Sequence, residues 1–392
     1  MKFASRLKMV ALGALLAFSP GLGAKADVQG VTDDEIVIGT LLDLSGPINF
    51  WGIPVKNGME LAVDDINKAG GINGRKLRLV IEDMAYDPKK AVLAAQKLLT
   101  SDKIFAMVGS MGTVTSAATM PLVLERGLPH LFPITPAEMF AVPFEKLKFA
   151  FFSPYYDDVR TSLKYLIAEK GFSRIGVMYQ DDEFGANVLQ AVKDQLAETG
   201  LEPVSVTSYK RGATDFSSQI ARLKADNADL VVLGTVVRET VGAMATAKNL
   251  GWHPAFLISQ AGYAPVTAQL GKDAVEGLYA GAMTPIPYPD TASPEVLAWI
   301  DSYKAKFGEE PNVQAVVGYI IIETAAMGMK NAGRDLTPET LAAGLEQIKD
   351  YHNIFGTAPL SFSATDHLGS RQTFLAQIQN GRWVALTGFM HY

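Results

Sequence analysis

The sequence has 392 residues, more than one typical domain holds, and this length suggests two domains. Hydrophobic residues make up 48% of the chain and charged residues 19%, which indicates a globular protein with a large core and excludes an intrinsically disordered one. The formal net charge of −6 argues against nucleic acid and anionic lipid as partners.

Residues 1–26 have the pattern of a secretory signal peptide. A basic start precedes the apolar stretch 9–18, which is too short to span a bilayer, and Ala24-Lys25-Ala26 has the small residues of a cleavage site. We therefore expect cleavage after Ala26 and a mature protein in the periplasm. Removal of this segment takes away four basic residues and no acidic one, which changes the net charge from −6 to −10. The chain has no cysteine, so no lipid-anchor cysteine or disulfide framework is expected. No later apolar run is long enough to predict a membrane-spanning helix.

Short β-rich runs alternate with helical patterns along the rest of the chain. The runs are 36–42, 76–83, 105–110, 174–180, 229–235, 255–259 and 277–283. Between the first two, apolar residues recur with helical spacing over 56–69. Asp87 and Pro88 predict the start of the next helix, and Gly171 predicts the end of a later one. This alternation predicts an α/β fold with doubly wound parallel sheets covered by helices on both faces.

A single sheet with all these strands would be unusually large, so we expect two lobes. Candidate crossings between them are residues 151–156, the proline-rich segment 283–294 and the region after Phe355. Lobe 1 is then expected to hold residues 27–150 and 284–356, and lobe 2 residues 151–283 and 357–392. The alternative is that these segments are surface loops within one domain.

Enzyme chemistry finds little support in the sequence. In VGSMGTVTS (108–116), Ser110 hints at a nucleophile elbow, but Val108 stands where that motif needs glycine. The histidines of the mature chain are scattered, and no zinc, phosphate-loop or dinucleotide motif is present. The pairs Asp157-Asp158 and Asp181-Asp182 are interpreted as helix caps rather than acid/base residues. We therefore predict no catalytic residue, no cofactor and no metal.

The same loop fits a ligand-binding function better than a catalytic one. Residues 109–116 form a strand-to-helix turn, where free amides at the helix start and hydroxyl side chains hold an anion, most simply a carboxylate. The alternative is that Thr113 and Thr115 only cap a helix.

Several segments together resemble one family. LLDLSGPINFWGIPVKNGMELAVDDINKAGGINGRKLRLVIEDMAYDPKKAV (41–92), MVGSMGTVTS, GLPHLFPIT and RIGVMYQDDEFG are similar, in order and spacing, to periplasmic binding proteins of the branched-chain amino-acid type. These proteins are the solute receptors of ABC importers. The resemblance covers almost all of the mature chain and implies a type I periplasmic binding fold: two Rossmann-like lobes joined by three hinge crossovers that close on a ligand. It also implies a monomer that does not insert into the membrane and that delivers its ligand to an inner-membrane ABC permease with separate ATPase subunits.

The resemblance implies site residues by position. Trp51 matches the aromatic residue that covers the ligand, and Thr113 matches the hydroxyl residue that holds its carboxylate. Ile134, Thr135 and Pro136 match the turn that completes the carboxylate site, with Thr135 or the backbone replacing a hydroxyl that the family has one position later. Phe184 matches an aromatic position of the second lobe.

One departure from the family pattern concerns the ligand itself. Ala261 stands where amino-acid binders of the family have the glutamate that pairs the ligand ammonium, and Val236 or Val237 stands where a tyrosine is common. Aromatic residues near the predicted strand ends favour a flat, apolar ligand; they are Trp51, Phe132, Phe151, Phe152, Tyr155, Tyr156, Phe184 and Tyr263.

We therefore expect an aromatic acid of benzoate or phenylpropanoid type. One alternative is a branched-chain or other aliphatic amino acid, whose ammonium would need another partner such as Gln260 or Glu239. A second alternative is a periplasmic ligand-sensing subunit.

Overall fold

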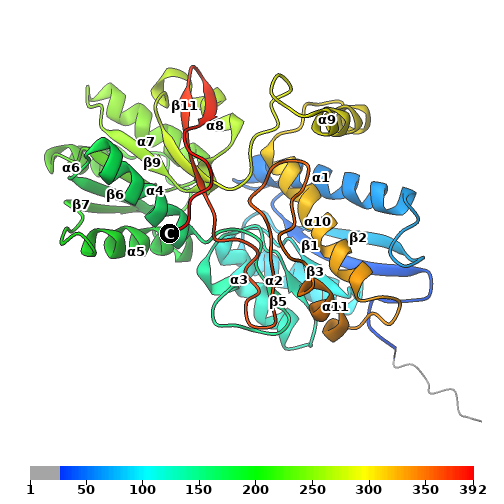
Figure 1. Cartoon of the computed structure of the whole chain (residues 1–392). Helices are drawn as coiled ribbons and strands as arrows, with labels where there is room; N and C mark the ends of the chain where they lie inside the picture. The colour runs from blue at the N-terminus through cyan, green and yellow to red at the C-terminus, as the bar shows by residue number, and fades with distance from the viewer. Residues whose placement is uncertain (1–26) are drawn as a thin grey trace, which may run out of the picture.

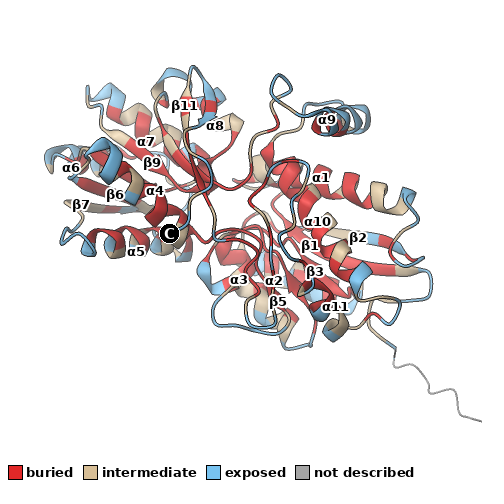
Figure 2. Ribbon diagram, viewed as in Figure 1, coloured by how far each residue is buried: buried red, intermediate tan, exposed pale blue. Residues whose placement is uncertain are grey.

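The structure, a computed structural model, describes residues 27–392. The predicted signal peptide and its predicted cleavage after Ala26 therefore lie outside the described residues. Two lobes lie side by side, and in each of them helices cover a central sheet (Figure 1). Most strands of the two sheets are buried, except the partly exposed edge strands at 76–83 and 382–385, and exposed residues gather on the outer helices and loops (Figure 2).

Lobe 1 contains a five-stranded sheet in which every pairing is parallel. Its strand order is β2-β1-β3-β4-β5. The strands are β1 (Glu35–Leu42), β2 (Lys76–Asp83), β3 (Ala106–Val108), β4 (His130–Leu131) and β5 (Lys148–Phe149). The helices are α1 (Asn49–Lys68), α2 (Pro88–Thr100), α3 (Thr113–Leu124), α9 (Pro294–Phe307), α10 (Val313–Asn331) and α11 (Pro338–Leu345), with the short 3-10 helix η1 (Glu138–Phe140).

Lobe 2 contains a seven-stranded sheet of order β12-β11-β10-β9-β8-β6-β7. The strands are β6 (Ile175–Gln180), β7 (Ser205–Tyr209), β8 (Leu230–Gly234), β9 (Ala255–Ile258), β10 (Tyr279–Ala282), β11 (Phe374–Gln379) and β12 (Arg382–Ala385). The helices are α4 (Tyr155–Lys170), α5 (Glu183–Ala197), α6 (Ser217–Ala225), α7 (Val237–Asn249) and α8 (Pro265–Gly271), with the 3-10 helices η2 (Gln260–Gly262) and η3 (Lys272–Ala274). β11 pairs antiparallel with both β10 and β12, so the expectation of a wholly parallel sheet is wrong for this edge.

The helix boundaries follow local chemistry. Asp87 caps α2 by accepting hydrogen bonds from the amides of Lys89 and Lys90, and Gly171 ends α4 in the left-handed conformation, as the sequence predicts. Helix α10 is apolar and long enough to cross a membrane, but 78% of its most apolar window is buried within the protein. It is therefore interpreted as the core helix of lobe 1, where it lies against α1 and α11.

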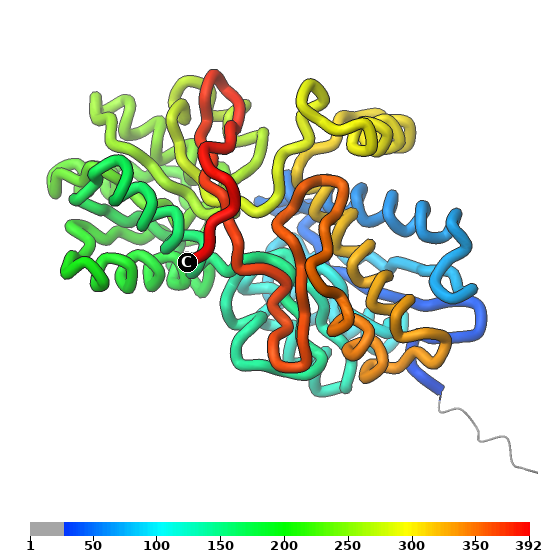
Figure 3. Tube along the Cα trace, in the orientation of Figure 1, coloured from blue at the N-terminus to red at the C-terminus, as the bar shows by residue number. Residues whose placement is uncertain are grey.

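Three segments connect the lobes (Figure 3). The first follows β5 and the second follows β10, close to the predicted crossings. The third lies later than the predicted boundary at residue 356, because Leu360 and Phe362 belong to the core of lobe 1. Ala150 of the first segment pairs with Leu368, so the third crossing lies beside the first, near Leu368.

The buried carboxylate of Asp158 lies where the three crossovers meet. Asp158, in the first turn of α4, accepts hydrogen bonds from the amide of Gln260 (3.1 Å) and the hydroxyl of Thr373 (3.1 Å). Thr373 also lies 3.0 Å from the carbonyl oxygen of Ala282, and the side chain of Gln260 donates to the carbonyl oxygen of Ser153. Asp158 is thus a hinge residue rather than the helix cap that the sequence suggests. Burial is the main cause that raises the pKa of Asp158 to about 7, and the nearby Asp157 contributes to this rise.

We expect Asp158→Asn to flatten the pH dependence of the free energy of unfolding. The pKa of Asp158 is raised in the folded state, so its stabilising contribution is present below about pH 4 and is lost as the pH rises to about 7. Asparagine imitates the protonated acid, since its oxygen accepts from Gln260 and its amide group donates to Thr373, whose own hydrogen goes to Ala282. Urea titrations of both proteins across this pH range measure the effect. Parallel pH profiles would contradict it.

Candidate functional site

A cavity lies between the lobes, where the loops after the strands of both sheets meet. Its lining residues come from both lobes: Ile48, Trp51, Tyr86, Met111, Gly112, Thr113, Ile134, Pro136, Phe152, Tyr155, Phe184, Val236, Gln260 and Ala261. The cavity thus occupies the position at which open α/β sheets bind ligands.

The wall contributed by lobe 1 is built around the start of α3. Met111 and Ile134 form a parallel bridge, and the amide of Gly112 donates to the carbonyl oxygen of Ile134 (3.1 Å). This pairing holds Thr113 at the cavity, where its hydroxyl oxygen lies 2.7 Å from that of Thr135. The first amides of a helix have no carbonyl partner within the helix, and they favour an anion. The start of α3, together with the hydroxyl of Thr113, therefore forms a cradle suited to a carboxylate.

The other hydroxyl residues of this loop have structural contacts. The Thr115 hydroxyl donates to the carbonyl oxygens of Met111 and Gly112, in the turn that precedes it. Ser110 does contact a histidine, with its hydroxyl oxygen 3.1 Å from Nε2 of His130, but both residues are buried and neither lines the cavity. Burial lowers the pKa of His130 to about 3, so its imidazole is neutral at physiological pH. The Ser110–His130 contact therefore lies in the core behind the cavity wall.

The lobes are in contact across the cavity. The indole nitrogen of Trp51, in lobe 1, donates to the carbonyl oxygen of Ala261, in lobe 2 (3.3 Å). The rings of Tyr155 and Phe184 meet edge to face at 5.0 Å and form part of the wall of lobe 2. The two lobes therefore meet beside the cavity, with aromatic rings on both sides of it.

The structure brings most of the predicted site residues together. Seven of them line the cavity: Trp51, Thr113, Ile134, Tyr155, Phe184, Val236 and Ala261. Thr135 reaches the site through its contact with Thr113. Tyr263 does not line the cavity, because its ring packs against Trp383 (5.1 Å) and Phe374 (6.0 Å) beside a separate groove.

The other aromatic residues divide between the cavity and the core. Phe152 lines the cavity, whereas Phe132 and Phe151 are fully buried core residues. Tyr156 points away from the cavity and donates a hydrogen bond to Asp194. Fewer rings converge on the ligand space than the sequence suggests.

Three lining residues, Ile48, Tyr86 and Met111, were not predicted from the sequence. Tyr86 follows β2 and has a left-handed backbone with φ of 52°. Its ring packs directly on Gly112, where a Cβ atom would lie 2.5 Å from ring carbon Cε2. A tyrosine directly before the Asp87 cap, in a loop at a strand's carboxyl end, is the signal in the sequence that points to this residue.

None of the lining residues is charged, and burial raises the pKa of the Tyr86 and Tyr155 hydroxyls, so the wall is neutral. The acidic residue that follows Val236 in the first turn of α7 is Glu239, which is 8% exposed. Burial raises the pKa of Glu239, and within residues 27–392 its Oε2 has no hydrogen-bond partner. No group of three or more metal-ligating side chains occurs in this part of the chain. The site is suited to a small, mainly apolar solute with one anionic group.

Comparison with known proteins gives a consistent result. Residues 35–382 match the family model described as periplasmic binding protein. The Leu/Ile/Val-binding protein homolog 8 of Brucella abortus (strain 2308) is 26% identical over 362 residues, which cover 88% of this chain and 87% of that protein. A fatty acid ABC transporter substrate-binding protein from Thermomonospora curvata superposes with a TM-score of 0.84 at 22% identity, over 93% of this chain and 94% of that one. A branched-chain amino acid ABC transporter protein from Thermus thermophilus with bound valine has a TM-score of 0.83 at 18% identity, over 92% and 98%. At these identities the two structures show a shared fold.

Proposed function

This chain belongs to the periplasmic binding protein family, and on that premise we propose that it is the solute receptor of an ABC importer that closes its two lobes on a small carboxylate ligand. The observation that carries this proposal is the cavity between the lobes, with Thr113 at the start of α3 on one side and the Trp51–Ala261 contact across it. In this proposal the closed, loaded protein delivers its ligand to an inner-membrane permease with separate ATPase subunits.

We propose an aliphatic α-amino acid as the leading ligand class. The name of the Brucella relative supports this class, and nothing in the comparisons supports the aromatic acid that the sequence favours. Ala261 leaves the ammonium without the family's glutamate, so another acceptor is needed. Glu239 has an unpartnered carboxylate oxygen, and Gln260 supplies an amide oxygen at the wall. An ammonium would neutralise a carboxylate that is otherwise costly to bury unpaired.

A carboxylate without an ammonium is the second candidate. The observation that favours it is the absence of any charged side chain among the lining residues between 27 and 392. A buried ammonium without a charged partner would cost several kcal/mol. An aromatic or branched aliphatic monocarboxylate avoids this cost and still finds Thr113.

Calorimetric titration of ligand-free protein separates these classes. The panel is leucine, isoleucine and valine, then 4-methylpentanoate, which is leucine without its amino group, and then benzoate and cinnamate. We expect at least one aliphatic amino acid to bind at least tenfold more tightly than 4-methylpentanoate, a difference of about 1.4 kcal/mol. The opposite order would establish the second candidate, and a protein that binds no carboxylate would contradict the proposed function.

Glu239→Gln provides the matched control for that panel. It keeps the shape of the side chain and removes its charge, so it should weaken the binding of the amino acid and leave 4-methylpentanoate unchanged. An equal loss for both ligands would assign Glu239 a structural role.

A further inference from the structure

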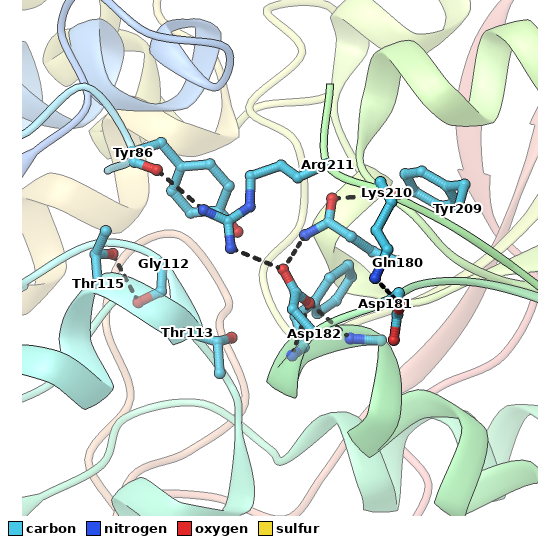
Figure 4. Close-up of polar contacts among 12 residues, drawn as sticks. Tyr86, Gly112, Thr113, Thr115, Gln180, Asp181, Asp182, Tyr209, Lys210 and Arg211 are labelled. Carbon is cyan, nitrogen blue, oxygen red and sulfur yellow. Dashed lines mark hydrogen bonds and ion pairs between the residues drawn. The ribbon is translucent and has the colours of Figure 1, made fainter. Parts of the chain in front are cut away.

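One arginine contacts both lobes beside the cavity. Arg211 lies in the loop after β7 of lobe 2, and its Nη1 donates to the carbonyl oxygen of Tyr86 in lobe 1 (3.4 Å). Its guanidinium carbon lies 5.0 Å from the centroid of the Tyr86 ring, a cation–π distance. Its Nη2 lies 3.2 Å from Oδ2 of Asp182 in its own lobe. Figure 4 shows the side chain of Arg211 extended between Tyr86 and Asp182.

In lobe 2, the partner of Arg211 is Asp182, whose carboxylate is held in place by several hydrogen bonds. Asp182 caps α5 by accepting from the amides of Phe184 (3.1 Å) and Gly185 (3.3 Å), and it also accepts from the side chain of Gln180. The side chain of Asp182 is only 8% exposed. A carboxylate fixed by this many donors holds the guanidinium in one place. It also positions Phe184, which lines the cavity.

The end in lobe 1 is part of the cavity wall. Tyr86 lines the cavity and its ring packs on Gly112, next to Thr113. Its left-handed backbone turns the carbonyl group that accepts from Arg211. A non-glycine residue keeps this conformation only where its surroundings enforce it. The Arg211 contact therefore connects closure of the lobes with the shape of the wall beside the carboxylate cradle.

The contact lies at the edge of each sheet that is far from the hinges. Tyr86 follows the edge strand β2, and Arg211 follows the edge strand β7. The first crossover leaves from β5, at the opposite edge of the first sheet, and the other two adjoin β10 and β11, toward the opposite edge of the second. A contact far from a hinge acts on the longest lever arm, so it resists opening more than an equal contact near the crossovers.

We propose that Arg211 is an interlobe latch: a positioning residue that stabilises the closed state through Tyr86 and Asp182 without touching the ligand. This inference rests on the proposed receptor function. A latch changes the closed population and therefore scales the affinity for every ligand by one factor, whereas a ligand contact would discriminate among ligands.

Arg211→Gln tests the latch directly. The chain has no cysteine, so Leu93→Cys in lobe 1 and Leu270→Cys in lobe 2, both at exposed positions, accept a donor and an acceptor dye. In this labelled background, single-molecule energy transfer of ligand-free protein should shift toward the open state when Arg211 is replaced. Leucine, used as the probe, should dissociate about tenfold faster. Asp182→Asn should reproduce the shift toward the open state. Arg211→Lys should show a smaller shift, because lysine keeps the charge but lacks the forked guanidinium that contacts two acceptors at once.

Lys210→Gln is the matched control, because Lys210 is adjacent, exposed and paired with Asp181 of its own lobe. It should leave both measurements unchanged. An unchanged energy-transfer distribution in Arg211→Gln would overturn the latch even if no ligand were known. Failure of every carboxylate to close the wild-type protein would instead overturn the receptor function. A loss of affinity confined to one ligand would make Arg211 a ligand contact.

Discussion

Thr113→Val is expected to weaken ligand binding by about 10- to 150-fold. The substitution keeps the β-branched shape at the start of α3 and removes the hydroxyl that lines the cavity. A hydrogen bond to a charged group contributes about 1.5–3 kcal/mol, which corresponds to this range of affinity. The loss should be the same for every carboxylate that binds, since all of them share the group that Thr113 holds. Calorimetric titration measures it.

Thr115→Val is the control for that substitution. Thr115 lies two residues further along the same helix, and its hydroxyl bonds to the carbonyl oxygens of Met111 and Gly112 instead of facing the cavity. The variant should bind with unchanged affinity, with at most a small loss of stability from the missing hydrogen bond to the preceding turn. If Thr113→Val kept full affinity, the cradle would be wrong, and the Thr113 hydroxyl would serve only its contact with Thr135.

The sequence predicts the α/β fold because apolar runs and helical periods are local signals. All seven predicted runs contain strands of the two sheets. The missed strands β4 and β5 have two residues each, too few for a period, and their pairing is set by the neighbouring strand β3 and by each other. The hairpin β11–β12 could have been predicted from the dipeptide Asn380-Gly381, because Asn-Gly favours a hairpin turn with two positive φ angles. Both residues have positive φ at the turn.

The site was predictable to the level of loops but not of side-chain directions. Tyr263 and Tyr86 both stand near strand ends, yet Tyr263 turns toward Trp383 while Tyr86 turns toward Gly112. The direction of each side chain depends on the residues packed around it in the folded protein, and those residues are distant in the sequence. Asp158 shows the same limit, since a capping pattern does not reveal that Thr373, more than 200 residues away, meets it.

Gly58→Ala is expected to lower the free energy of unfolding by about 3 kcal/mol, although alanine normally stabilises a helix interior by about 1 kcal/mol relative to glycine. Helix α1 crosses α10 at this point, and a Cβ atom on Gly58 would lie 1.9 Å from the backbone oxygen of Ala315. On the facing helix, a Cβ on Gly318 would lie 2.2 Å from the carbonyl oxygen of Val55, so neither backbone has room to yield.

The helices must therefore separate, and α1 also carries Trp51, which contacts Ala261 across the cavity. Urea titration should show the loss of stability, and calorimetry should show weaker binding in the same variant, because the tryptophan moves with its helix. Gly388→Ala, where an added Cβ meets no atom within 4 Å, should change neither quantity. A Gly58→Ala protein that is as stable as the wild type would mean that the two helices can shift without cost. Weaker binding with unchanged stability would mean that Trp51 moves independently of the helix crossing.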